Sequence, residues 1–426
     1  MNSLFTYKIT KKIFLFSYTF LFIFNPTNFF SFNLIHLLSS LAFIYAITSP
    51  FTFANLLKNK RYLLLLFVFI VISIYLLLIQ PTIIDRYSED TYYQLYNLFI
   101  VIIEAPLCSF FIVSFFKKTY DCNINDLFIF ILKICFIQVL FVLLALITPE
   151  FREWSLSTSR LDNIMLISNQ FGVLRSYGLA TGYTSTLPML MGICVLFCIG
   201  YTLKYPIKRG IIYLSIIPFF ILSIILNART GLIPILLFCF LYPIFYINKI
   251  KLFMKISFFL GFISFLGLVF ITLFLDGKYF TRIIWMYEEI YNLSSGNITG
   301  TFEYLFIKMH FLPKTMTLTL FGTGQNVFGL KSHGSDIGYI REIHLMGLLS
   351  TILLIVTFIF FIKPAVILIK KNFDSLTASI ICISLFLFYF KGVCISSNEV
   401  TNTIFILTIA SIVWKNKLEI NTLSKK

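Results

Sequence analysis

Charged residues are scarce in this chain of 426 residues. Asp, Glu, Lys and Arg together make up 12% of the sequence, about half the share that is usual in soluble proteins. Apolar residues make up 59%, and apolar runs long enough to cross a bilayer recur from end to end. The composition excludes an ordinary soluble protein and predicts one all-α, polytopic membrane domain that occupies residues 1–426.

Several sequence motifs are also missing. The loops contain no Walker motif and no dinucleotide fingerprint, so we expect no nucleotide site. The 8 cysteines and 4 histidines show no metal-ligand spacing, which argues against a zinc site, another bound metal or a disulfide framework. The net charge of +16 is spread over short loops rather than gathered on one soluble face, so no nucleic-acid partner is expected. We predict no cofactor.

The apolar runs predict about twelve transmembrane helices. The first follows Lys8, Lys11 and Lys12 like a signal peptide, but no small-residue cleavage site follows it, so it is interpreted as a retained helix. The predicted spans lie near 13–24, 29–49, 62–80, 93–116, 127–148, 183–203, 210–226, 231–247, 256–275, 339–362, 376–390 and 397–414.

The loops on the side of the two termini carry most of the basic residues. The positive-inside rule therefore places both termini in the cytoplasm. Two long loops then face outward, one near 149–182 and a larger one near 276–338, before the tenth helix. The larger loop contains a stretch with helical spacing from Tyr279 to Asn292, which includes Arg282, and a second helical candidate from Phe302 to Leu312. We expect the working surface of the protein to face outward, because elaborated loops usually carry function.

Arg229 lies in the tight outward turn from Asn227 to Gly231. It is either an interfacial arginine whose guanidinium reaches the lipid headgroups or a fixed cation that binds phosphate through two parallel hydrogen bonds. Arg175 begins the segment Arg175-Ser176-Tyr177-Gly178, before a helix whose N-terminus can bind an anion. It is either a phosphate-binding residue or a loop arginine paired with a nearby carboxylate. Gly178 lets the backbone approach a ligand closely, and Tyr177 is a candidate for stacking on a sugar.

The end of the larger loop crowds charged residues at the membrane edge. His333 and Asp336 are candidates for a general base, although Ser335 or Asp336 could simply cap the helix that follows. Lys331, Tyr339, Arg341 and the more distant Arg282 are candidate substrate-binding residues, and Arg341 and Glu342 could instead pair with charges on neighbouring helices.

Glu104 lies near the middle of an apolar span and is followed by Pro106. A charge at that depth costs about 3 kcal/mol, so we expect this carboxyl group to be paired, protonated or facing a cavity. Lys391 and Glu399 border the last short outer loop and could line the rim of a cavity. We interpret His36 and His310 as structural.

Three short islands make the chain resemble a known family. They are Arg175-Ser176-Tyr177-Gly178, the turn from Asn227 to Gly231, and Gly322-Thr323-Gly324 followed by Ser335 to Tyr339 and leading to Gly347. Together with the number of spans and the long late loop, they are similar to the O-antigen polymerases (Wzy). That family shares a superfamily with the O-antigen ligases.

The resemblance implies a donor, undecaprenyl pyrophosphate carrying an oligosaccharide. It implies metal-independent glycosyl transfer on the periplasmic face of a bacterial inner membrane, in lipopolysaccharide O-antigen biosynthesis. Arg175 and Arg229 fall on the arginine islands of the family, which makes them expected catalytic residues with His333 and Asp336. Inner-membrane lipids would surround the protein, and a chain-length regulator is left open as a partner.

Two other functions remain open from the sequence. An O-antigen ligase uses the same donor, but the ligases resemble one another in a His-Asn pair at the end of the long loop, where this chain has His333-Gly334-Ser335-Asp336. A repeat-unit flippase also has about twelve helices, but its two halves should be related and its outer loops short.

Overall fold

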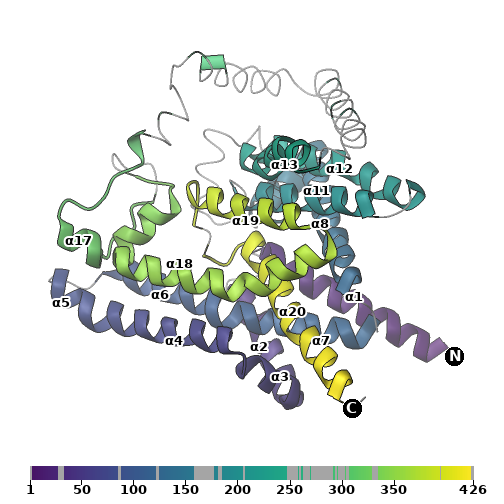
Figure 1. Cartoon of the computed structure of the whole chain (residues 1–426), viewed down its shortest axis with the longest axis horizontal. Coiled ribbons are helices and arrows are strands. Elements are labelled where there is room, and N and C mark those ends of the chain that lie inside the picture. The colour runs from purple at the N-terminus through teal and green to yellow at the C-terminus, as the bar shows by residue number, and fades with distance from the viewer. Residues whose placement is uncertain are drawn as a thin grey trace.

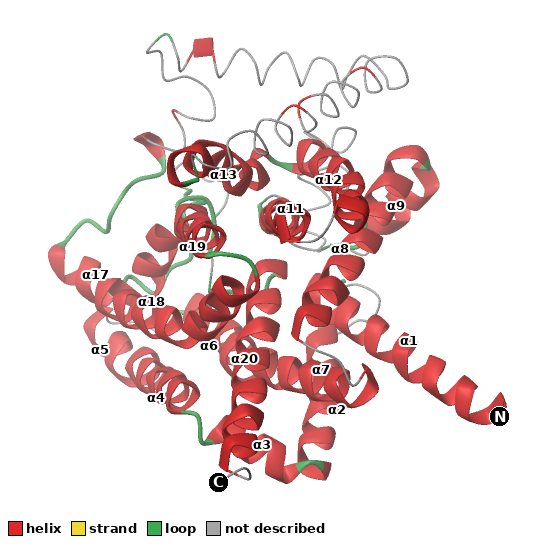
Figure 2. Ribbon diagram, turned by 45° about the vertical axis from the view of Figure 1, so that its right-hand side comes forward, coloured by secondary structure: helices red, strands yellow, loops and turns green. Residues whose placement is uncertain are grey.

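The protein is a bundle of α-helices, seen here in a computed structural model of the whole chain (Figures 1 and 2). The structure describes residues 2–26, 33–84, 88–120, 124–157, 177–180, 185–204, 207–246, 307–328, 334–393 and 395–423, with isolated positions between 258 and 303. Within these residues every long regular element is a helix, as the apolar composition predicts.

The helices follow the chain in this order. They are α1 (Asn2–Phe24), α2 (Leu34–Thr48), α3 (Pro50–Leu57), α4 (Lys60–Ile74), the π-helical turn η1 (Tyr75–Ile79), α5 (Gln80–Ile84), α6 (Glu89–Phe99), the π-helical turn η2 (Ile100–Glu104), α7 (Ala105–Tyr120), α8 (Ile124–Ile147), α9 (Pro149–Ser157), α11 (Thr186–Lys204), α12 (Ile207–Asn227), the 3-10 turn η3 (Arg229–Gly231), α13 (Leu232–Phe245), α17 (Met316–Phe321), α18 (Gly338–Asn372), α19 (Ser375–Tyr389) and α20 (Glu399–Leu423).

Within the described residues, 6 helical segments are long and apolar enough to cross a membrane. They are Lys60–Ile84, Glu89–Tyr120, Ile124–Ile147, Thr186–Lys204, Gly210–Asn227 and Gly338–Asn372. Shorter apolar helices are Leu34–Thr48, Leu232–Phe245, Ser375–Tyr389 and Glu399–Trp414. The chain is therefore an α-helical membrane protein. Each predicted span overlaps a described helix, except 256–275, which lies almost entirely outside the described residues.

Two details differ from the expectation. The segment after residue 362, predicted to be a short loop, continues α18 as far as Asn372 and contains Pro364 within the helix. Membrane helices tolerate an internal proline because neighbouring groups satisfy the carbonyl that it leaves free. The start of the predicted loop 149–182 folds as the helix α9. Most of the predicted helix 279–292 lies outside the described residues. Of the predicted helix 302–312, residues 303 and 307–312 are described, and residues 309–312 are not helical.

The helix α11 occupies the centre of the bundle. In the most apolar stretch of α11, 89% of the residues are buried, whereas in that of the span containing α4 only 28% are buried. α4 therefore has a broad face left for lipid. Figure 2 shows α11 among α8, α12, α13 and α19, with which it is in contact. Gly192 makes the packing possible, because a methyl group there would meet the carbonyl oxygen of Gly231 at 2.2 Å. Small residues at helix interfaces allow such close approach.

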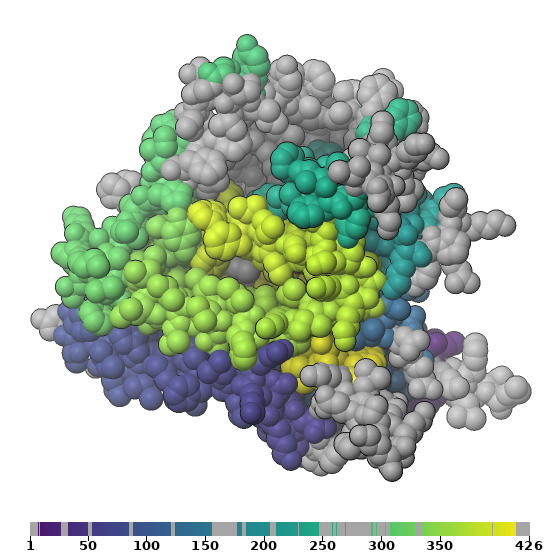
Figure 3. Space-filling model, viewed as in Figure 1, coloured from purple at the N-terminus to yellow at the C-terminus, as the bar shows by residue number. Residues whose placement is uncertain are grey.

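The helices α4, α6 and α18 pack together and run across the lower half of Figure 1. α5 and α17 lie at the left of that view, and the marked chain ends lie at the lower right. On the face in Figure 3, α18 and α19 cover the middle of the molecule and α4 lies below them. The polar residues described next gather around the first turns of α18.

Candidate functional site

α18 is broken near its start at Gly347. This residue has φ 79° and ψ 162°, far from helical values, and a positive φ costs an L-amino acid side chain conformational energy. Gly322, with φ 82°, lies directly against it. A methyl group on Gly347 would lie 2.3 Å from the carbonyl oxygen of Leu320, and one on Gly322 would lie 2.6 Å from the Gly347 nitrogen. The two glycines therefore let two backbone segments cross in contact.

The break leaves helix carbonyls without their usual partners, and the neighbouring segments supply donors. The backbone N–H groups of Thr323 and Gly324 donate to the His344 oxygen at 2.6 and 3.1 Å, and the Thr323 hydroxyl donates to it at 3.0 Å. Gln80 Nε2 donates to the oxygens of Leu345 at 2.7 Å and Phe321 at 3.1 Å. Because a bilayer offers no water to satisfy such groups, these bonds fix the turn 322–324 onto the broken helix.

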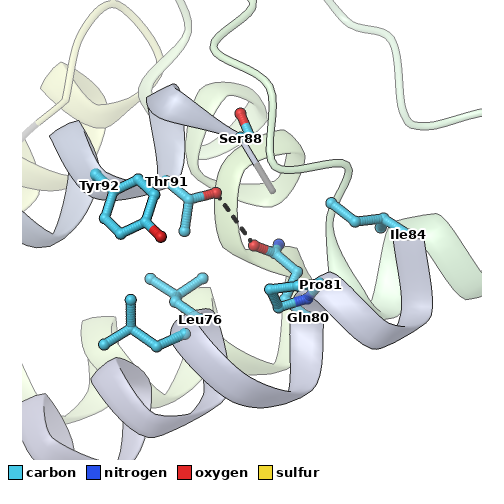
Figure 4. A pocket seen from close by; sticks show the side chains of 8 residues that line it. Leu76, Gln80, Pro81, Ile84, Ser88, Thr91 and Tyr92 are labelled. Carbon is cyan, nitrogen blue, oxygen red and sulfur yellow. Dashed lines mark hydrogen bonds between the residues drawn. The ribbon is translucent and has the colours of Figure 1, made fainter. Parts of the chain in front are cut away.

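The first turn of α6 holds the same loop from its other side. Asp90 Oδ2 accepts from the Asn326 N–H at 2.9 Å, and the Ser88 hydroxyl donates to the Gly324 oxygen. Figure 4 shows the hollow beside these contacts, where the Thr91 hydroxyl donates to Gln80 Oε1 at 3.4 Å. The hollow has room for about one water molecule, so it is a joint between segments and too small for a sugar.

Ser335 fixes the approach to α18. Its N–H donates to the Val327 oxygen at 2.8 Å and its hydroxyl to the Met309 oxygen at 2.9 Å, while that hydroxyl accepts from the Ile337 N–H at 3.2 Å. Ile337 is the N-cap and makes no side-chain cap. The expectation that Ser335 or Asp336 caps the helix was therefore wrong. The half-buried carboxylate of Asp336 is in none of the described hydrogen bonds, which leaves it for electrostatic contact with Arg341.

Arg341 lies in the first turn of α18. Its guanidinium carbon is 4.2 Å from the centre of the Phe328 ring, a cation–π contact. The Asp336 and Glu342 carboxylates and the Tyr93 hydroxyl lie close enough to act electrostatically on it. Among the described residues Nε of Arg341 has no hydrogen-bond partner. The residue is thus a half-buried cation with unused donor capacity.

Glu342 is 1% exposed and accepts a hydrogen bond from the Tyr389 hydroxyl. Its other oxygen has no hydrogen-bond partner among the described residues, an arrangement that costs free energy unless something else binds there. Tyr339, one turn away from Glu342, makes a 2.6 Å hydrogen bond with Nδ1 of His310, and its ring lies 6.4 Å from that of Tyr389. We call Asp336, Arg341, Glu342 and Tyr389 the end cluster.

Close backbone contacts connect the end cluster with the Arg229 turn. A methyl group on Gly338 would lie 2.3 Å from the Gly392 oxygen, and one on Gly392 would lie 3.4 Å from the Ser185 hydroxyl. The Ser185 carbonyl in turn accepts from the Thr230 hydroxyl at 3.2 Å. The starts of α18 and α11, the loop before α20 and the turn η3 therefore meet at one end of the bundle.

Two further groups lie at this junction or near it. Glu399 is buried at the start of α20 and accepts from the Thr186 hydroxyl at 2.5 Å. Tyr177 is 4% exposed, and Gln138 Nε2 donates to its carbonyl at 2.7 Å. Gly178 has φ 58°, and a methyl group there would lie 3.0 Å from the Val142 nitrogen. The glycine is thus needed for packing onto α8, and its expected approach to a ligand stays a prediction.

The structure brings some of the candidate residues together, whereas others lie outside the described residues. Asp336, Tyr339 and Arg341 come together around the first turns of α18, and the backbone of Arg229 is in η3 at the same end of the bundle. The side chain of Arg229, and all of Arg175, Arg282, Lys331 and His333, lie outside the described residues. No sequence motif indicated Gln80 or Tyr389 as part of this region. A glutamine that ends a long apolar run, just before Pro81, was the available signal for Gln80.

Comparison with known proteins adds no relative, since no protein-family model, curated protein or solved structure matches this chain. What the site can do is therefore argued from its chemistry. A half-buried guanidinium beside two carboxylates and two tyrosine hydroxyls can bind an anionic group and orient sugar hydroxyls.

Proposed function

We propose that this chain polymerises lipid-linked oligosaccharide repeats. It would transfer a glycan from undecaprenyl pyrophosphate to the terminal sugar of another lipid-linked repeat, as an O-antigen polymerase without a metal ion. The proposal includes about twelve spans, cytoplasmic termini and a site at the periplasmic face of the bacterial inner membrane. The observation that carries it is the meeting of two separate sequence islands, the Arg229 turn and the segment 335–341, at one end of the bundle.

The chemistry needs stabilisation of negative charge. As the anomeric C–O bond breaks, the lipid pyrophosphate leaves with the bonding electron pair and gains charge. Each charged hydrogen bond from an arginine contributes about 1.5–3 kcal/mol, and more where water is excluded from a preorganised site. Arg341 has unused donor capacity at this end of the bundle, and Arg229 and Arg175 are the further arginines we assign to the leaving group. The pyrophosphate already activates the donor, so no nucleotide is needed.

Replacement of the two island arginines tests the assignment. We expect Arg229→Ala and Arg175→Ala each to abolish the polymer while the protein still inserts at the normal level, because the pyrophosphate loses its cation. The measurement is the banding of surface polysaccharide in a deletion strain that carries each variant. Arg61→Ala is the matched control, since Arg61 lies in the first turn of α4, where its guanidinium carbon is 5.2 Å from the centre of the Phe360 ring. A normal ladder in both test variants would reject the site.

A second candidate function is transport of the lipid-linked repeat. The broken helix α18 and the carboxylate Glu104 within a span favour it, because transporters use discontinuous helices and intramembrane charges. The deletion strain separates the candidates. Loss of a polymerase leaves core carrying a single repeat, loss of a flippase removes surface repeats altogether, and loss of a ligase leaves polymer on its lipid carrier.

A further inference from the structure

Glu104 lies near the middle of the span Glu89–Tyr120 and is 7% exposed. A carboxylate at such a depth costs about 3 kcal/mol unless it is paired. Here the pairing is complete on both oxygens. Nδ1 of His36, on α2, lies 2.8 and 2.9 Å from the two carboxylate oxygens, and the Ser39 hydroxyl donates to Oε1 at 2.9 Å. The expectation of a paired carboxyl group is confirmed.

The other nitrogen of His36 faces a tyrosine. Nε2 lies 2.5 Å from the Tyr96 hydroxyl on α6. Because a carboxylate only accepts, it holds the hydrogen on Nδ1 and leaves Nε2 free to accept from the hydroxyl. The order carboxylate, imidazole, hydroxyl is the one by which a histidine withdraws a proton from a hydroxyl group. We call His36, Ser39, Tyr96 and Glu104 the mid-span cluster.

The π-helical turn η2 is what aligns Tyr96 with Glu104. The two residues are eight positions apart, and at about 100° per residue an uninterrupted α-helix would separate them by about 80° around its axis. A π turn accommodates one extra residue. Tyr96 and Glu104 are therefore related as if they were seven positions apart in a regular helix, which leaves an angle of about 20° between them around the helix axis. The turn therefore places the hydroxyl and the carboxylate on one face, on either side of His36.

Tyr96 is the exposed member of the mid-span cluster, and a second tyrosine lies between it and the end cluster. Tyr96 is 40% exposed whereas Glu104 is buried. The ring of Tyr93, on the preceding turn of α6, lies 6.5 Å from that of Tyr96, and Tyr93 is also close enough to act on Arg341. A row of tyrosines on α6 thus runs from the arginine to the histidine.

Other titratable groups pack around the pair. Cys108 of α7 interacts electrostatically with Glu104, and it hydrogen-bonds with Tyr18 of α1. The hydroxyl of Tyr18 also donates to the Leu38 oxygen of α2 at 2.7 Å. Among the described residues His36 is the one basic side chain paired with Glu104.

We propose that Tyr96, His36 and Glu104 accept the proton released by the acceptor sugar in the polymerisation proposed above, on which this inference rests. The acceptor oxygen forms the new bond to the anomeric carbon, and the pyrophosphate oxygen leaves with the electron pair of the broken bond. The acceptor proton passes to the Tyr96 oxygen while the Tyr96 proton passes to Nε2 of His36. Glu104 stabilises the resulting imidazolium, which then returns the proton to the departing pyrophosphate or to water.

The test is the rate of glycan transfer by the full chain in proteoliposomes supplied with undecaprenyl-pyrophosphate-linked repeats, expressed per amount of folded protein. His36→Gln should lower this rate about 100-fold or more, because the group that accepts the proton is lost. Tyr96→Phe should also lower the rate, because the hydroxyl group that passes the proton to Nε2 of His36 is lost.

Glu104→Gln should lower the rate as well, because the imidazolium loses the carboxylate that stabilises it. Tyr45→Phe on α2 is the control, since it removes a tyrosine hydroxyl outside the cluster. Wild-type rates in the His36 and Tyr96 variants would overturn this inference alone. A wild-type protein that transfers no glycan would overturn the proposed function, and this inference with it. A purely structural role would lower the melting temperature and the protein yield but leave the rate per folded protein unchanged, which would also overturn the inference.

Discussion

The end cluster and the mid-span cluster differ in the kind of charge that they hold. The end cluster contains a guanidinium, which stays charged at all relevant pH values, beside carboxylates that it does not fully engage. The mid-span cluster contains an imidazole and a carboxylate that satisfy each other at 2.8 Å. A permanent cation with spare donors suits the binding of a phosphate, whereas a matched titratable pair suits the movement of a proton. In the polymerisation proposed above, the end cluster would stabilise negative charge and the mid-span cluster would accept the proton.

The two clusters also depend on different irregularities of helix geometry. The end cluster lies just before the break at Gly347, where outside donors satisfy the carbonyls. The mid-span cluster lies at a π-helical turn, which changes the facing of side chains without ending the helix. Both irregularities cost regular hydrogen bonding, and both place polar side chains where an ideal apolar helix would not.

Within the two clusters, the largest expected effect comes from removing the cation of the end cluster. Arg341→Ala should lower the transfer rate by about 100- to 1000-fold, because the leaving group loses a charged donor. Arg341→Lys should restore part of the rate, since a lysine keeps the charge but loses the planar pair of donors. Single-turnover transfer in proteoliposomes measures both. A wild-type rate in Arg341→Ala would show that the two clusters do not divide the work in this way.

A change at the helix break should affect the end cluster through stability. Gly347→Ala places a methyl group 2.3 Å from the Leu320 oxygen at a positive φ, which costs about 1–3 kcal/mol for the backbone alone. We expect a lower melting temperature of the purified protein and loss of transfer. Gly261→Ala is the control, because a methyl group there meets no atom within 4 Å. Equal melting temperatures for the two variants would contradict the crossing of segments 320–322 and 347.

The smallest effect should come from the serine of the mid-span cluster. Ser39→Ala removes one hydrogen bond to Glu104 and should lower the free energy of unfolding by about 1–2 kcal/mol. The adjacent Ser40, whose hydroxyl donates to the His36 carbonyl at 2.7 Å, provides a matched variant. Ser40→Ala should change stability by less, because its partner is a neutral helix carbonyl. Denaturant unfolding measures the loss of stability in both variants. A larger loss in Ser40→Ala than in Ser39→Ala would contradict the charged hydrogen bond from Ser39 to Glu104.

The helices could be predicted from the sequence because apolar runs of sufficient length have few alternatives in lipid. Glu104 was recognisable as a paired group because an isolated charge in a span is expensive. Its partner His36 was not, since 68 positions separate the two residues and the π turn that aligns them leaves no simple pattern. The alternative reading of Ser335 or Asp336 as a helix cap was wrong, because Ile337 is the N-cap. The close packing of Gly178 on α8 could not be predicted either, because it depends on which segment lies opposite.

The amino-acid sequence by itself determined that this is an α-helical membrane protein and where its apolar helices lie, because transfer of apolar surface into lipid depends on local composition. Only the tertiary structure decided which polar groups meet. Gln80 caps a helix 265 positions away, Tyr389 binds Glu342, and Tyr93 connects two clusters on different helices. Hydrogen bonds of this kind are directional and act over a few ångströms, so they depend on how the helices cross and on where two of them depart from regular geometry.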